Sequence, residues 1–433
     1  MTSIVTEDAA TAPAVDLADD SDWRRAESLP LAQRIGAFAF LLTGYFCYAW
    51  TWNTVDVLRP YIAEDLHLSL TQAGSLYSAQ AAGALLGAVI NGQLADRFGR
   101  RNALVVVMLA YGLLLVTGAF VTSYPQVIAQ RFALGYFTGT MYPITVGIYV
   151  TLFPPAIRGR LAGVALGVYN AAVAVLGAAG ALVLDHDWRI LLYVGAIPAV
   201  LSFFALLVMP DDRRLIPHGG VRPVQAMAKL PIIELFKPAV RRQTLLLVLM
   251  CGLNFFAYQA FTGWVTTYLK TVRGLDGAAI GLIVSWQFWG SCIGGFAWGW
   301  LADRYGRRCG AIGFVIAAAI IIYYLRAPAS VAVIAASGFA YGFAISSSVV
   351  WGPWLTELYP AHLRSTAASI FNWGRIISFF APLITAGVAA RFGLTIGMTL
   401  ASGCFLGAAL IWWGIPETLG NLRRDASSSI NGD

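Results

Sequence analysis

Charged side chains are scarce in this chain, and their scarcity excludes an ordinary soluble protein. Asp, Glu, Lys and Arg make up 12% of the 433 residues, whereas soluble domains carry about a quarter. Apolar residues make up 58%, and the mean hydropathy is +0.69. Because a membrane-spanning helix needs about 20 mostly apolar residues, the length accommodates many spans and leaves no room for a large soluble domain.

Cysteine and histidine are also sparse, which argues against metal and redox chemistry. The five cysteines stand singly in or beside apolar runs, so we expect buried, inert thiols. The four histidines fall in loops or at span ends, which argues against a histidine proton relay in the membrane. The sequence also lacks a Ser/His/Asp set and a phosphate-binding glycine loop. We therefore expect no enzymatic activity, no metal and no cofactor.

Apolar runs bounded by charge, Gly or Pro predict an all-α membrane protein. Twelve runs are present, at 34–57, 73–95, 102–122, 126–152, 161–184, 189–209, 243–269, 278–301, 309–325, 330–357, 366–389 and 394–415. The predicted domains are two six-helix bundles at 34–209 and 243–415, joined by a cytosolic linker at 210–242 that holds seven basic residues. We expect cytosolic tails at 1–33 and 416–433, the first disordered and without a cleavable signal peptide.

The distribution of basic residues predicts the orientation. With both termini in the cytosol, 21 of the 29 Lys and Arg lie in cytosolic segments and six in outside loops, including Arg59. This bias follows the positive-inside rule. It accounts for the net charge of +7 without nucleic acid as a partner.

The two predicted bundles share repeated motifs. Gly92-Gln-Leu-Ala-Asp96-Arg97-Phe-Gly99-Arg100-Arg101 recurs as Gly299-Trp-Leu-Ala-Asp303-Arg304-Tyr-Gly306-Arg307-Arg308, an offset of 207 residues. Phe153-Pro154 to Arg158 recurs as Tyr359-Pro360 to Arg364 at an offset of 206. Two such offsets indicate a duplicated six-span unit, which is typical of secondary transporters.

On these motifs the chain resembles the major facilitator superfamily over nearly all of residues 34–415. The resemblance implies two six-helix bundles related by a pseudo-two-fold axis, and a cytosolic latch formed by the duplicated loop. A purely topological role for its arginines is the alternative. The expected cytosolic gate consists of Gly92, Asp96, Arg97, Gly99, Arg100, Arg101, Asp303, Arg304, Gly306, Arg307, Arg308, Glu357 and Arg364.

Three ionisable residues lie clearly within predicted spans: Asp56, Arg131 and Arg375. Inserting such a side chain at the membrane centre costs about 2.5–3.5 kcal/mol of free energy, so each of the three indicates a structural or functional role. Asp56 and Arg131 lie at similar depth in neighbouring parts of the predicted bundle, so we expect them to pair. The residues alone leave open whether the pair is a proton switch or a fixed ion pair.

The resemblance favours the switch. Asn53-Thr-Val-Asp56 stands where sialate, lactate and aromatic-acid symporters carry Asp-x-x-Asp, and Arg131-Phe-Ala-Leu-Gly135 with Gly139 looks like their fourth-span arginine motif. This implies that Asp56 and Arg131 couple transport to protons. Asn53 replaces the first acid, which puts a two-proton scheme in doubt.

Arg375 is predicted about 13 Å into the eleventh span, near the membrane midplane. No intramembrane acid of the second half can neutralise it, and its planar fork would suit a carboxylate. Asn372 lies one turn away on the same face. The alternative is that Arg375 snorkels or pairs with Glu357.

Other polar residues are candidates for substrate contacts, with interhelical hydrogen bonds as the alternative. They are Gln259, Gln287, Asn53, Tyr142 and Asn170.

The sequence thus predicts a proton symporter of a small organic acid anion. We expect it to act as a monomer in the cytoplasmic (inner) membrane, with the lipid bilayer, protons and the substrate as its partners. A proton-coupled sugar or polyol symporter is the alternative, because Pro416-Glu417-Thr418-Leu-Gly420 resembles a sugar-porter motif. A drug/proton antiporter and a non-transporting receptor fit less well.

Overall fold

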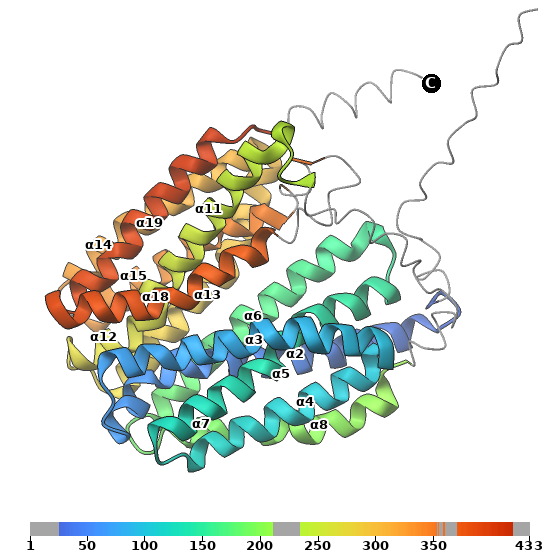
Figure 1. The fold of residues 1–433 in the computed structure, drawn as a ribbon, viewed down its shortest axis with the longest axis horizontal. Coiled ribbons are helices and arrows are strands. Elements are labelled where there is room, and N and C mark those ends of the chain that lie inside the picture. Colours follow the sequence, from blue (N-terminus) through green and yellow to red (C-terminus); the bar gives the residue numbers. More distant parts are fainter. Residues whose placement is uncertain (1–25, 211–233, 353, 355–357, 360–369, 419–433) are drawn as a thin grey trace, which may run out of the picture.

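The computed structural model describes residues 26–210, 234–352, 354, 358–359 and 370–418, and in these ranges the secondary structure is helical throughout. Ten helical segments are long and apolar enough to cross a membrane, and Ile376–Phe392 is a shorter apolar helix. Together with the helix Tyr124–Leu152, these form six membrane-length segments in each half. The predicted all-α architecture of two six-helix bundles is confirmed (Figure 1).

The first half runs through six segments. They are α2 (Leu31–Asp65), α3 (Leu70–Phe98), α4 (Arg100–Thr117), α5 (Tyr124–Leu152), α6 (Pro155–Val183), and the pair α7 (Ile190–Tyr193) and α8 (Ala196–Val208). Buried apolar side chains of this half form one core cluster.

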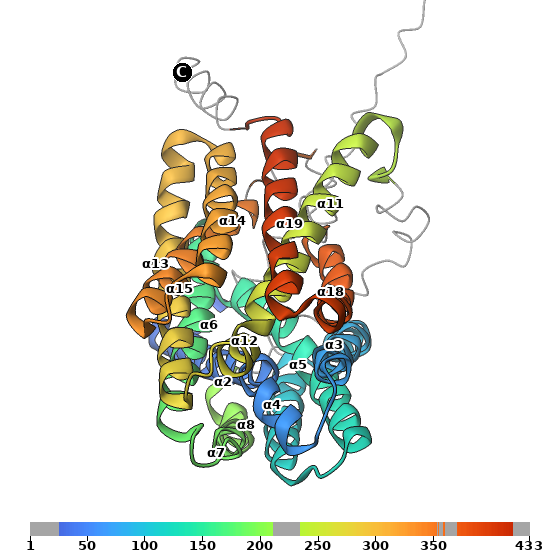
Figure 2. The same ribbon diagram turned by 90° about the vertical axis from the view of Figure 1, so that its left-hand side faces the viewer.

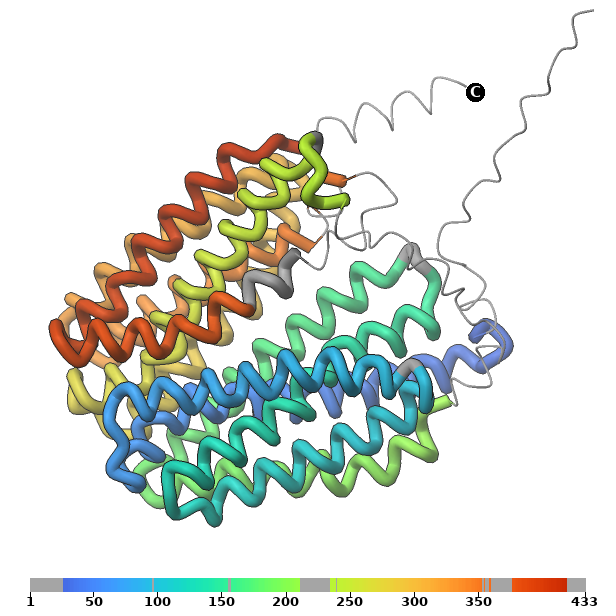
Figure 3. Tube along the Cα trace, in the orientation of Figure 1, coloured from blue at the N-terminus to red at the C-terminus, as the bar shows by residue number. Residues whose placement is uncertain are grey.

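The second half repeats this arrangement and packs a core of its own. Its helices are α11 (Pro238–Phe261), α12 (Val265–Thr271), α13 (Gly277–Tyr305), α14 (Gly310–Arg326), α15 (Val331–Ile345), α18 (Ile370–Phe392) and α19 (Leu394–Gly414). A 3-10 turn, η3 (Thr262–Trp264), joins α11 to α12. The Cα trace shows the two sets of helices as separate bundles (Figure 3).

The halves pack against each other mainly through three pairs of helices: α6 with α13, α3 with α18, and α2 with α12. They lie together at the end where α2 finishes and α13 begins, which we call the closed end. Toward the opposite end, where α2 begins and α19 finishes, the ribbons of the two halves diverge (Figure 1), and Figure 2 views the molecule from the closed end.

Glycines allow close contact between the halves. Gly177 of α6 faces Gly281 of α13, and a Cβ atom on Gly281 would lie 2.5 Å from the carbonyl oxygen of Gly177. Because real Cβ contacts are never this short, only glycine permits the observed helix spacing.

Candidate functional site

A buried ion pair lies on the last three turns of α2. The carboxylate of Asp56 accepts from the guanidinium of Arg59, three residues later, at 2.6 Å. Both residues are buried, and Arg59 is completely inaccessible. The sequence placed Arg59 in an outside loop, which is wrong: α2 continues through Pro60 to Asp65, eight residues beyond the expected end of the span.

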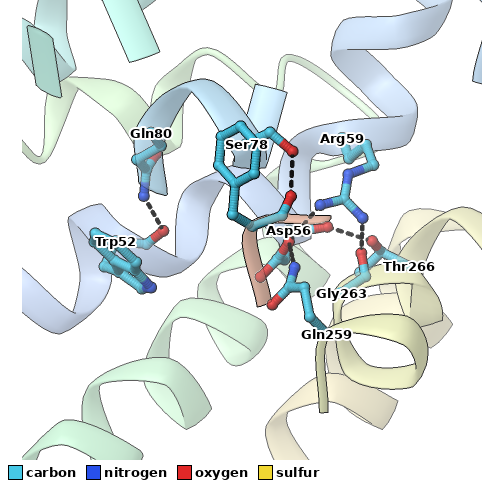
Figure 4. A network of polar contacts seen from close by, with 9 residues as sticks. Trp52, Asp56, Arg59, Ser78, Gln80, Gln259, Gly263 and Thr266 are labelled. Atoms are coloured by element: carbon cyan, nitrogen blue, oxygen red, sulfur yellow. Dashed lines mark hydrogen bonds and ion pairs between the residues drawn. The ribbon is translucent and has the colours of Figure 1, made fainter. Parts of the chain in front are cut away.

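This ion pair also contacts the second half (Figure 4). The side-chain amide of Gln259 in α11 donates to the same Asp56 oxygen at 2.9 Å. Arg59 donates to the backbone carbonyl of Gly263, and its guanidinium lies 4.6 Å from the ring centre of Trp264. Asp56 and Arg59 are therefore shared between the two halves.

Two helix irregularities supply backbone atoms to this network. Pro60 has no N–H, so the carbonyl of Asp56 cannot receive its usual helical hydrogen bond. Thr266 of the second half donates to this carbonyl at 2.5 Å instead. The 3-10 turn η3 presents the carbonyl of Gly263 to Arg59.

Arg131 on α5 is not the ion-pair partner that the sequence predicted for Asp56. Its guanidinium donates to the hydroxyl of Thr54 at 3.1 Å, and its Nε atom has no hydrogen-bond partner among the described residues. Arg131 is only 1% exposed and acts on Asp56 electrostatically, without a direct bond. Arg59 is the ion-pair partner of Asp56 instead of Arg131, because α2 is longer than predicted and Arg59 lies within it.

A small pocket lies beside the network, between the halves. Its polar lining comes from Asn53, Asp56, Thr262, Thr266 and Gln287, and the remaining lining is valine side chains and Phe288. Two of the predicted substrate residues, Asn53 and Gln287, therefore line it. A third, Gln259, adjoins it through its bond to Asp56.

The lining residues differ in whether their polar atoms have hydrogen-bond partners. Asn53 donates to Ala49 within its own helix at 2.7 Å and to the hydroxyl of Tyr169 at 3.0 Å. Gln287 is buried, and its side-chain oxygen has no partner among the described residues. An acceptor in this position is available to a donor group on a ligand.

The remaining predicted substrate residues lie elsewhere. Tyr142 is exposed, and Asn170 donates to Leu166 of its own helix at 3.2 Å. Asn372 and Arg375 lie in the first two turns of α18, but their side chains are outside the described part of the structure. Their predicted contact with a substrate stays a prediction.

The duplicated loop forms tight turns at the end of the molecule opposite the closed end. Gly99 and Gly306 have φ angles of 91° and 106°, which side chains other than glycine rarely adopt. Arg100 donates to the carbonyl of Gly147 at 2.7 Å, and Arg307 pairs with Asp303 at 2.7 Å. The first bond ties its loop to α5 of the same half, whereas the second lies within its own copy of the motif.

Other predicted gate residues are more peripheral or undescribed. Arg97 lies over Phe98, and Arg304 lies over Trp300 and Tyr305. Arg308 donates to the carbonyl of Ile415 at 2.7 Å. The surroundings of Gly92 are open. The side chain of Asp96 and the whole of Glu357 and Arg364 lie outside the described residues. The role of these three residues and of Arg101 in a gate remains a prediction.

Glu417 is a further residue at this loop that was not predicted from the sequence. Its carboxylate accepts from the backbone N–H groups of Arg307 and Arg308, each at 2.9 Å. A carboxylate at a helix N-terminus satisfies free N–H groups and favours the helix dipole. The Pro-Glu-Thr motif is visible in the sequence. It lies 110 residues from the loop along the chain, so the sequence did not indicate the contact.

At the closed end, acidic residues of the first half bind the second. Asp185 accepts from the backbone N–H groups of Gly277 and Ala278, at the start of α13, at 2.6 and 3.1 Å. Glu64 pairs with Lys270. Together with the Asp56 network, these contacts hold the two halves together at this end.

Comparisons with known proteins agree with this architecture. A model of the Major Facilitator Superfamily matches residues 41–280 and 273–429. A cis,cis-muconate transport protein of Acinetobacter baylyi is 26% identical, with 79% of this chain and 85% of that protein covered. The niacin transporter NiaP of the same organism is 25% identical, covering 83% and 88%. A crystal structure of a D-xylose-proton symporter has a TM-score of 0.70 at 18% identity, covering 89% and 98%.

Proposed function

Because this chain belongs to the Major Facilitator Superfamily, we propose that this multi-pass membrane protein is a secondary transporter that imports a small organic acid anion together with protons. The observation that carries the proposal is a buried membrane carboxylate, Asp56, whose hydrogen-bond partners come from both halves. Relatives named for the transport of muconate and niacin support an organic acid as the substrate.

The proton site follows from the position of Asp56. When the two halves rock about a central site, two bonds between the halves must change: the bond from Gln259 to Asp56, and the bond from Arg59 to Gly263. A carboxylate that gains or loses hydrogen bonds and a cation changes its affinity for protons. Asp56 is therefore suited to bind a proton in one state and release it in the other.

The proposed anion site is formed by residues of α18. Arg375 lies in the second turn of that helix and Asn372 one turn before it. A guanidinium donates two parallel hydrogen bonds to a carboxylate, which a lysine cannot reproduce. Gln287 of the pocket offers an acceptor to a hydroxyl of the substrate.

A panel of carboxylates tested on the purified protein would identify the substrate class. A ligand that binds the folded state raises the unfolding temperature, so we expect at least one organic acid to do so. Arg375→Lys should abolish this shift, while Arg391→Lys, an exposed arginine at the far end of the same helix, should retain it. An undiminished shift in Arg375→Lys would make Arg375 structural.

A sugar or polyol symporter is the second candidate, and the fold of the D-xylose-proton symporter supports it. The contact of Glu417 with the duplicated loop belongs to the motif that resembles sugar porters. A neutral sugar cannot neutralise Arg375. Stabilisation by a sugar, but by none of the acids, in both wild type and Arg375→Ala would favour this candidate.

A further inference from the structure

Arg59 is the cation of the network that the two halves share. It is completely buried, and its partners divide between the halves. One terminal nitrogen donates to Asp56 at 2.6 Å on its own helix. The other donates to the carbonyl of Gly263, beside the ring of Trp264, on the second half.

The chemistry of the side chain explains why an arginine occupies this position. The guanidinium carries its donors on separate nitrogens of a rigid plane, so it can bond an acid on one side and a carbonyl on the other. A lysine has a single nitrogen and cannot span both acceptors in this geometry. The bond to Gly263 exists only while the halves are together at the closed end.

We propose that Arg59 is the positioning residue that links the charge of Asp56 to closure between the halves, an inference that rests on the proposed proton coupling. Ionised Asp56 holds Arg59 in place, and Arg59 in turn binds Gly263 and Trp264. Protonation of Asp56 removes the negative charge that balances the buried guanidinium. Arg59 then leaves the second half, and the closed end opens.

The other groups around Asp56 do not provide this link. Arg131 approaches from α5 but bonds Thr54 of the same half. Tyr258 and Gln259 of α11 and Thr266 of α12 are uncharged partners from the second half. Tyr77 on α3 and Tyr169 on α6 belong to the half that carries Asp56. Arg59 is thus the described cation that touches both Asp56 and the opposite half.

Distances between spin labels on the two halves can test this proposal without any transport measurement. The full-length chain, with its five natural cysteines replaced by serine, would carry single cysteines at Thr122 and Ala329. Both are exposed residues in loops at the closed end, one on each half. Labelled protein in lipid nanodiscs would be measured at neutral pH and at pH 5.

Wild-type protein should show mainly short distances at neutral pH and more long distances at pH 5. Arg59→Lys should raise the long-distance fraction at neutral pH by about fivefold, the factor for one net hydrogen bond, and weaken the response to acid. Arg189→Lys is the matched control, because Arg189 pairs with Asp65 within the first half. It should behave as wild type.

Short distances and a normal acid response in Arg59→Lys would overturn the proposal. If that variant does not yield a monodisperse protein, Trp264→Leu removes the ring against Arg59 from the other side of the interface. It should shift the distances in the same direction, and unchanged distances would overturn the proposal equally. Proton-independent uptake of the anion by wild type would instead contradict the proposed function, whatever the distances show.

Discussion

Two buried arginines near Asp56 show how much the surroundings of a residue decide its role. Arg59 bonds the acid and the opposite half, whereas Arg131 bonds a hydroxyl of its own half. Removing one partner of a buried charge pair leaves the other charge uncompensated, at a cost of about 3–5 kcal/mol. Asp56 therefore serves as a counter-ion as well as a candidate proton site.

Replacing Asp56 by asparagine tests its role in coupling. Asn keeps the size of the side chain and an acceptor oxygen, but it cannot bind a transported proton. We expect Asp56→Asn to abolish accumulation of the anion driven by a pH gradient and to retain exchange of labelled for unlabelled substrate in proteoliposomes. Both activities would be measured side by side.

The control for this experiment is Asp65→Asn, at the end of the same helix. Asp65 is solvent-exposed and pairs with Arg189, so its charge should not matter for accumulation. Accumulation at the wild-type level in Asp56→Asn would refute a coupling role for Asp56.

At the scale of the elements, interruptions of helix regularity place polar backbone atoms between the halves. Pro60 within α2 frees the carbonyl that Thr266 binds, and η3 interrupts the helix pair α11 and α12 where Gly263 receives Arg59. Membrane helices tolerate such breaks because neighbouring helices satisfy the freed groups. Here the neighbouring helix belongs to the other half.

Packing of α6 against α13 gives a prediction at this scale. Gly281→Ala would place a Cβ atom 2.5 Å from the carbonyl oxygen of Gly177, so the helices must separate, at a cost of about 1–3 kcal/mol. We expect the closed end to open, seen as a larger long-distance fraction between labels at Thr122 and Ala329, and transport to slow.

Gly295 on the same helix provides the control, because no atom lies within 4 Å of a Cβ atom built there. Gly295→Ala should leave the distances unchanged and stabilise α13 by up to about 1 kcal/mol. An equal effect of both substitutions would show that helix propensity, not contact between the halves, governs the response.

At the scale of the whole molecule, each half has an apolar core formed mainly by its own side chains, which allows the halves to move as units. The contacts between them include hydrogen bonds, ion pairs and glycine-mediated helix packing at the closed end, and Val284 and Phe288 of α13 pack against the core of the first half. Each half keeps its own apolar core when those contacts break. Such an arrangement suits alternating access, in which a central site faces one side of the membrane at a time.

Orientation is a prediction for the whole molecule. With 21 of the 29 basic residues in the predicted cytosolic segments, the positive-inside rule predicts that both termini lie on the cytosolic side of the inner membrane. Alkaline phosphatase, which is active only outside the cytosol, should be active when fused after Ala329 and inactive when fused after His218 in the linker. The reverse pattern would contradict the orientation and place the closed end on the cytosolic side.

The sequence by itself determined the features that depend on local composition and repetition. Apolar runs bounded by charges specify spans because backbone groups in lipid must bond within a helix. The duplicated Gly-x-Leu-Ala-Asp-Arg loop identified the two halves and the family, and burial of Asp56 and Arg131 followed from their place within spans.

Only the tertiary structure decided which charges meet. Arg59 and Pro60 appeared to end the first span, yet the helix continues because Asp56 and the second half satisfy the guanidinium, and Thr266 satisfies the carbonyl that Pro60 cannot serve. Gln259 and Gly263 lie more than 200 residues away in the chain. No local pattern encodes such contacts, because they arise from how two independently packed bundles lie against each other.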